Sequence, residues 1–201
     1  GIKYSLIISN DMVVFSNSIG DITAVDVQTG LILWQLPTQS SNIVNETYNF
    51  KNSKLVSDGN SIYFSNNKNE FYSIDAKTGT TNWTNEINST ITPVIINNLI
   101  FTVSEEGYLY VIEKNEGNII RISNLFTSYK EKVRKNLKPI GFAIGNLNLY
   151  STNSHGDIIV SDLNSGSILN KKKIGNNLIS RPFIYNNSLF VVRNGSIVKY
   201  N

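Results

Sequence analysis

Four acidic residues recur at one position of a repeated motif, and carboxylates gathered at a common site could bind calcium. Each acid follows a turn residue by six positions and precedes a glycine by four positions. The acids are Asp26, Asp75, Glu113 and Asp162, and the glycines are Gly30, Gly79, Gly117 and Gly166. Because each acid lies in a different repeat, we expect neighbouring acids to be too far apart to chelate one ion. An acid at the start of a turn also accepts hydrogen bonds from backbone amides, so we interpret the four as structural and predict no structural metal.

Residue types that carry catalysis are otherwise scarce. The chain has no cysteine, which excludes a thiol nucleophile, a disulfide and a cysteine-ligated zinc site. Its single histidine, His155, lies in the turn Asn153–Gly156, where a histidine is more often solvated than catalytic. No serine, histidine and aspartate can be grouped around it on geometric grounds. We therefore predict no quinone cofactor, no catalytic residue and no enzymatic turnover.

The composition favours strands joined by turns. The 201 residues include 30 asparagines and 27 isoleucines but only three alanines. β-branched residues favour strands, asparagine favours turns, and the scarcity of alanine disfavours helix. The net charge of +3 and the isoelectric point near 9.0 are too mild to indicate nucleic-acid binding. No apolar run reaches the roughly 18 residues of a membrane-spanning helix.

The spacing of the motif sets the size of the repeat. The closing glycines are separated by 49, 38 and 49 residues, which is the length of a four-stranded propeller blade. We predict an all-β propeller chain of four-stranded antiparallel blades, with under about a tenth of the residues in helix. The blades are expected at about 4–36, 53–84, 92–123 and 140–171, with a partial blade of three strands at 181–201. Because Asn201 occupies the acid position, we expect the last outer strand to come from outside this segment, upstream of Gly1.

Two kinds of turn are expected in each blade. The first and second strands meet at residues rich in Asn, Asp and Gly, such as Gly145–Asn146, which tolerate left-handed backbone angles. The third and fourth strands meet at the acid-to-glycine segment, whose glycine suits a hairpin that closes through a left-handed bulge. Trp34 and Trp83 follow that glycine by four positions, and we expect each to wedge against the next blade. Arg121 and Asn170 hold the equivalent positions, so those contacts should be weaker or different.

Two copies of the motif resemble the PQQ-like propeller repeat. They are Ile-Asp-Ala-Lys-Thr-Gly-Thr-Thr-Asn-Trp at 74–83 and Val-Asp-Val-Gln-Thr-Gly-Leu-Ile-Leu-Trp at 25–34. The final stretch, residues 181–201, is similar to the C-terminus of the BamB family, the scaffold lipoproteins of the outer-membrane β-barrel assembly machinery. This resemblance implies an eight-bladed ring, of which the chain would hold the C-terminal half.

The BamB resemblance implies a non-enzymatic interaction scaffold. It implies a periplasmic protein, held at the inner face of the outer membrane by a lipid anchor upstream of this segment. Its partners would be BamA-like POTRA domains and unfolded outer-membrane proteins, with no nucleic acid and no cofactor. Because PQQ-like repeats also occur elsewhere, a quinoprotein or ligand-sensing propeller fragment is the alternative. A structural propeller without a role in barrel assembly is a third.

The longest connection between the first two blades, Gln39–Ser53, is the candidate partner surface. The resemblance places an acidic partner-binding loop within it, but this sequence has one acid there and no aspartate pair, so we carry over the loop and not its charges. Exposed apolar residues in a loop mark a contact patch, and the alternative is that they cap the blade core. The residues concerned are Ile43, Val44, Glu46, Tyr48 and Phe50.

Two basic stretches complete the pattern. Tyr129–Lys138 carries five basic residues and one acid, and is interpreted as a solvated loop or short surface helix, with contact to anionic lipid or a partner as the alternative. Lys171–Lys173 falls on an expected outer strand, where lysines protect a sheet edge from unwanted pairing.

Overall fold

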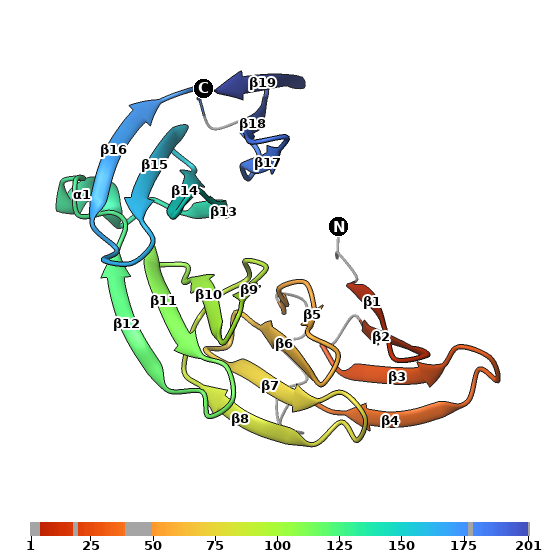
Figure 1. The fold of residues 1–201 in the computed structure, drawn as a ribbon. Helices are drawn as coiled ribbons and strands as arrows, with labels where there is room; N and C mark the ends of the chain where they lie inside the picture. The colour runs from red at the N-terminus through yellow and green to blue at the C-terminus, as the bar shows by residue number, and fades with distance from the viewer. Residues whose placement is uncertain (1–4, 18–19, 39–49, 177–178, 201) are drawn as a thin grey trace. The chain divides into compact units, whose positions relative to one another are not determined.

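A computed structural model describes residues 5–17, 20–38, 50–176 and 179–200. The chain forms two compact units. The first unit comprises Gly1–Thr102 with Ile112–Ile119, and the second comprises Val103–Val111 with Ile120–Asn201. In both units the strands of every sheet are hydrogen-bonded in chain order (Figure 1).

The first unit holds two complete sheets and part of a third. The first sheet consists of β1 (Leu6–Ser9), β2 (Met12–Ser16), β3 (Ile22–Asp26) and β4 (Ile32–Leu36). The second consists of β5 (Val56–Ser57), β6 (Ser61–Ser65), β7 (Phe71–Asp75) and β8 (Thr81–Asn85). The third, through which the boundary between the units passes, consists of β9 (Val94–Ile96), β10 (Leu99–Val103), β11 (Tyr108–Glu113) and β12 (Ile119–Asn124).

The second unit holds the last two sheets and the helix. The fourth sheet consists of β13 (Pro139–Gly145), β14 (Asn148–Asn153), β15 (Asp157–Asp162) and β16 (Ile168–Lys173). The fifth consists of β17 (Phe183–Tyr185), β18 (Ser188–Arg193) and β19 (Ser196–Tyr200). In the described part of the chain the sole helix is α1 (Glu131–Arg134). The all-β prediction of four four-stranded sheets and a three-stranded fifth is confirmed.

The middle strands of each sheet carry the core. Strand β6 reads Ser-Ile-Tyr-Phe-Ser and is almost wholly buried, whereas the outer strand β8 reads Thr-Asn-Trp-Thr-Asn and is largely exposed. The core of the first unit joins its first two sheets through Val14, Ile22, Trp34, Ile62, Phe64 and Ile74. A smaller cluster in the second unit joins its two sheets through Ile158, Ile174, Ile179 and Val191. The apolar pattern therefore packs sheets face to face.

Asparagine-rich turns join the first two strands of most sheets. Asn10 and Asp11 have φ values of 47° and 61°, and Asn186 and Asn187 have values of 45° and 55°. In the fourth sheet the turn residues are Asn146 and Leu147, not the predicted Gly145–Asn146. The register explains the shift, because Gly145 pairs with Asn148 in the β13–β14 ladder and leaves the two residues between them to reverse the chain.

The repeated acid organises the turn between the third and fourth strands. Asp75 Oδ1 accepts hydrogen bonds from the Lys77 amide at 2.9 Å, the Thr78 amide at 2.8 Å and the Thr78 hydroxyl at 2.9 Å. The Gly79 amide then donates to the Asp75 carbonyl at 2.9 Å. Asp26, Glu113 and Asp162 accept amide hydrogen bonds in the same way. Turn geometry thus accounts for the acid at this position.

The two tryptophans connect neighbouring sheets by hydrogen bonds within the first unit. Trp34 Nε1 donates to the Ala76 carbonyl at 3.1 Å, and Trp83 Nε1 donates to the Lys114 carbonyl at 3.0 Å. Both acceptors are the residues that directly follow a repeated acid, so each turn presents its carbonyl to an indole. Each indole also lies against the closing glycine of the turn it contacts, Gly79 or Gly117.

Replacing Trp34 by alanine should lower the free energy of unfolding by about 3–5 kcal/mol, because it removes a buried ring and its hydrogen bond. Leu33→Ala is the matched control on the same strand, since Leu33 is 49% exposed. It should change stability by less than about 1 kcal/mol. Urea unfolding followed by circular dichroism measures the free energy of unfolding of both variants. Equal losses of stability would contradict a role for Trp34 in holding the two sheets together.

Gly79→Ala should destabilise more than Gly30→Ala. The two glycines have φ values of 73° and 71°, so left-handed strain of about 1–2 kcal/mol applies equally to both variants. A Cβ at residue 79 would lie 2.5 Å from Trp34 Cδ2, whereas at residue 30 it would meet nothing within 4 Å. Overpacking should therefore add about 1–3 kcal/mol at residue 79 alone, measured by the same unfolding experiment. Equal effects would show that backbone conformation alone requires the glycine.

The turn carboxylates should also make stability depend on acidity. The Thr78 amide hydrogen bond lowers the pKa of Asp75 below 3.8, against a weaker opposing effect of burial. A group with a lowered folded pKa contributes stability above its unfolded pKa, and that contribution is lost as the pH falls through the folded value. Asp75→Asn should therefore be less stable than the parent at neutral pH, and the gap should narrow as the pH falls below 3.8 and through the lower folded pKa of Asp75. An equal gap at neutral pH and in acid would contradict this assignment.

Candidate interaction site

The tryptophan position changes identity in the second unit. Arg121 stands there in β12, and its guanidinium donates to the Leu163 carbonyl at 2.8 Å and to the Asn164 carbonyl. Leu163 directly follows the acid Asp162, so arginine reaches the same acceptor that tryptophan reaches in the first unit. The sequence predicts that the contact at Arg121 differs from the tryptophan contacts. The structure shows a polar contact to the same backbone carbonyl position.

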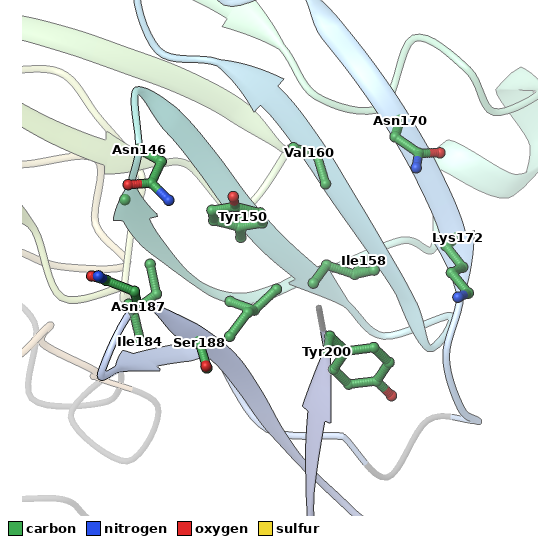
Figure 2. Close-up of a pocket in the computed structure, with 12 residues that line it drawn as sticks. Asn146, Tyr150, Ile158, Val160, Asn170, Lys172, Ile184, Asn187, Ser188 and Tyr200 are labelled. Carbon is green, nitrogen blue, oxygen red and sulfur yellow. The ribbon is translucent and has the colours of Figure 1, made fainter.

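The next equivalent residue, Asn170 in β16, is too short to bridge, and a pocket lies beside it. The pocket has a cavity volume of about 670 Å³ and lies between the fourth and fifth sheets (Figure 2). It is lined by Gly145, Asn146, Tyr150, Ile158, Val160, Asn170, Lys172, Ile184, Asn187, Ser188, Leu189 and Tyr200. Every lining residue belongs to the second unit.

The two sheets approach closely at their inner strands and also meet through the apolar cluster that contains Ile158 and Val191. A Cβ at Gly141 would lie 2.5 Å from Arg181 Cβ, and one at Gly145 would lie 2.5 Å from Ile184 Cδ1. These close approaches hold β13 against β17. Asn170 lines the pocket from β16, at a position where no side chain as long as tryptophan or arginine is present. The sequence shows the change at Asn170, but the pocket itself depends on how the two sheets pack.

The lining combines an apolar floor with hydrogen-bonding groups. Ile158 and Val160 project from β15, and Asn170 and Lys172 project from β16 (Figure 2). The Tyr200 hydroxyl is buried and has no hydrogen-bond partner among the described residues. The pocket thus suits an apolar group with polar atoms that can meet Asn170 or Lys172.

His155 belongs to a hydrogen-bonded network that secures the insertion between the third and fourth sheets. Its Nδ1 lies 3.3 Å from Asp157 Oδ2, which also accepts the Tyr129 hydroxyl at 2.6 Å. Asn153 Nδ2 donates to the same tyrosine oxygen at 2.8 Å. Burial is the main cause that raises the pKa of Tyr129 well above its usual range, so its hydroxyl stays protonated. Because Tyr129 begins the basic stretch, this network fixes that stretch to β15.

Within the described ranges, no three His, Asp or Glu side chains are grouped as a metal site would require. The helix described is too short to cross a membrane. Phe50 is 8% exposed, and its ring occupies the space where a Cβ at Gly20 would lie, which favours the capping interpretation for this residue. The other predicted contact residues, Ile43, Val44, Glu46 and Tyr48, lie outside the described residues.

Solved structures similar to this chain define its fold class as a β-propeller. The crystal structure of BamB from Moraxella catarrhalis has a TM-score of 0.60 and 18% identity, over 96% of this chain and 67% of that one. The computationally designed Ika8 protein has a TM-score of 0.73 and 15% identity, over 97% and 57%. The Cps50 (Swd1) β-propeller domain of Myceliophteria thermophila has a TM-score of 0.67 and 11% identity, over 93% and 60%.

The sequence narrows this class to one family. The model of the family described as outer membrane protein assembly factor BamB matches residues 3–123, and the chain belongs to that family. A BamB of Shewanella oneidensis is 26% identical over 104 residues, which are 50% of this chain and 24% of that protein. The matched stretch thus spans about a quarter of that curated relative.

Proposed function

We propose that this chain acts in a non-enzymatic interaction scaffold that assists assembly of outer-membrane β-barrel proteins. Membership of the outer membrane protein assembly factor family, through residues 3–123, is the observation that carries this proposal. We place the protein in the periplasm, lipid-anchored at the inner face of the outer membrane, as the family resemblance implies. Its partners would be BamA-like POTRA domains and, during assembly, unfolded barrel proteins.

The pocket beside Asn170 supports a binding role. Within the chain, the equivalent positions are filled by an indole or a guanidinium that donates to a backbone carbonyl. An aromatic or long apolar side chain from a partner would fill the pocket as the tryptophans fill their own sites. Buried anchors of this kind carry most of the binding free energy at protein interfaces.

We propose a second contact in the connection Gln39–Ser53. Ile43, Val44, Glu46 and Tyr48 are the residues concerned. Tyrosine and aliphatic residues are common anchors at such surfaces. Phe50 is buried in the chain, so it is left out of this proposed contact.

Binding of the chain to purified POTRA domains of its own assembly machinery tests the proposal. The Asn170→Trp variant should fill the pocket from within and weaken binding at least about tenfold, a loss typical of a blocked anchor site. Leu169→Trp is the matched control, because Leu169 neighbours Asn170 on the same strand, is 59% exposed and does not line the pocket. It should leave the dissociation constant within about twofold. Tyr48→Ala should weaken binding independently of the pocket.

Two results would contradict the proposal. If the parent chain does not bind the POTRA domains, the assembly role fails for this segment. If Asn170→Trp and Leu169→Trp weaken binding equally, the pocket is not the contact.

A ligand-sensing propeller is the second candidate function, because the pocket volume of about 670 Å³ lies within the usual range for small-molecule sites. A small molecule that raises the unfolding temperature of the parent, but not of Asn170→Trp, would favour it.

A further inference from the structure

Positive charge in this chain is concentrated in two short stretches. Eight of the 18 lysines and arginines fall within residues 130–138 and 171–173, and Glu131 is the one acid in those stretches. The first stretch contains α1 and the second forms the end of β16. The uneven distribution gives this part of the second unit a charge far above the chain average.

The structure brings the two stretches together. Lys171 Nζ lies 4.2 Å from the centroid of the Tyr129 ring, and Tyr129 directly precedes Lys130 in the chain. Lys173 Nζ donates to the His155 carbonyl, on the same face of β16 as Lys171. Alternation along a strand turns Lys172 to the opposite face, where it lines the pocket. We define the basic patch as the basic residues of 130–138 together with Lys171 and Lys173.

Little of this charge is neutralised by the protein. Lys135 pairs with Glu131 at 3.4 Å, but both side chains are more than 70% exposed, so water and salt screen the pair. Lys138 lies 4.0 Å from Glu105. In the described part of the chain, Lys130, Lys132 and Arg134 have no ion-pair partner. Asp157 lies beneath the patch but is buried and bonded to Tyr129 and His155.

Edge protection explains only part of the patch. β16 is the outer strand of its sheet, so its lysines would discourage pairing with another strand. The insertion around α1 is not a strand edge, yet it contributes the larger share of the charge. Lys132 and Arg134 in the last turn of α1 complement the helix dipole, but at an exposed helix end this contributes only weakly to stability. The charge of the insertion therefore needs an external explanation.

We propose that the basic patch binds the surface of a phospholipid membrane through its anionic headgroups. All but one of the basic residues are lysines, which are hydrated point charges on flexible stems and suit a mobile array of phosphates. Recognition of one acidic protein would favour arginine forks in a shaped groove. The patch has a single arginine, Arg134, and no residue of α1 is buried. This inference rests on charge and stands apart from the proposed assembly role.

Vesicle flotation with the full chain tests the proposal. Binding to phosphatidylcholine vesicles containing phosphatidylglycerol should exceed binding to pure phosphatidylcholine by more than about tenfold, and should fall as salt is added. The variant with three charge reversals should bind the anionic vesicles more weakly, with the partition coefficient falling at least about fivefold for each residue changed. Its substitutions are Lys132→Glu, Arg134→Glu and Lys135→Glu. All three positions are exposed, so folding should persist, and circular dichroism checks it.

The control variant changes net charge equally in the first unit, by Lys51→Glu, Lys54→Glu and Lys77→Glu, all exposed. It should retain most of the vesicle binding. Equal losses in the two triple variants would overturn the proposal, because net charge alone would then explain attraction. Absence of vesicle binding, together with tight binding of a polyglutamate peptide at physiological salt, would assign the patch to an acidic protein instead. Loss of POTRA binding in the pocket variants has no bearing on either result.

Discussion

The contact on which successive sheets depend is a hydrogen bond from an indole to a backbone carbonyl of the next sheet. Within the first unit it is made twice, by Trp34 to Ala76 and by Trp83 to Lys114. The carbonyl is available because the acid before it holds the turn in a fixed conformation with its side-chain oxygens. The closing glycine leaves room for the ring, since a Cβ at Gly79 would collide with it. The acid, the glycine and the tryptophan therefore act together. Without the tryptophan, for example, the glycine would no longer be needed to leave room for an indole ring.

The second unit shows what happens when that contact is altered. Arg121 keeps the acceptor but replaces the buried ring by a charged group with two carbonyl partners. Asn170 makes no such contact, and it lines the pocket between the fourth and fifth sheets. The inner strands approach closely at Gly141 and Gly145, and Gly145 and Ile184 also line the pocket. Variation at one repeat position thus changes how successive sheets meet.

Strand β16 carries two chemically different surfaces because side chains alternate along it. Asn170 and Lys172 face the pocket, whereas Lys171 and Lys173 face the Tyr129 insertion. One surface is partly apolar and suits a protein side chain, and the other is basic and suits anionic headgroups. The two-residue period of the strand keeps these two surfaces on separate faces.

The sequence alone determined the all-β class, the number of sheets and the role of the acid-to-glycine turn, because these depend on short spacings that local hydrogen bonds enforce. It also indicated that Arg121 and Asn170 would differ from the tryptophans. It misplaced the turn at Asn146–Leu147, since strand register follows from pairing across the sheet and not from turn propensity. The pocket, the Tyr129 network and the joining of two basic stretches depended on tertiary structure, because each is made by residues separated by more than twenty positions.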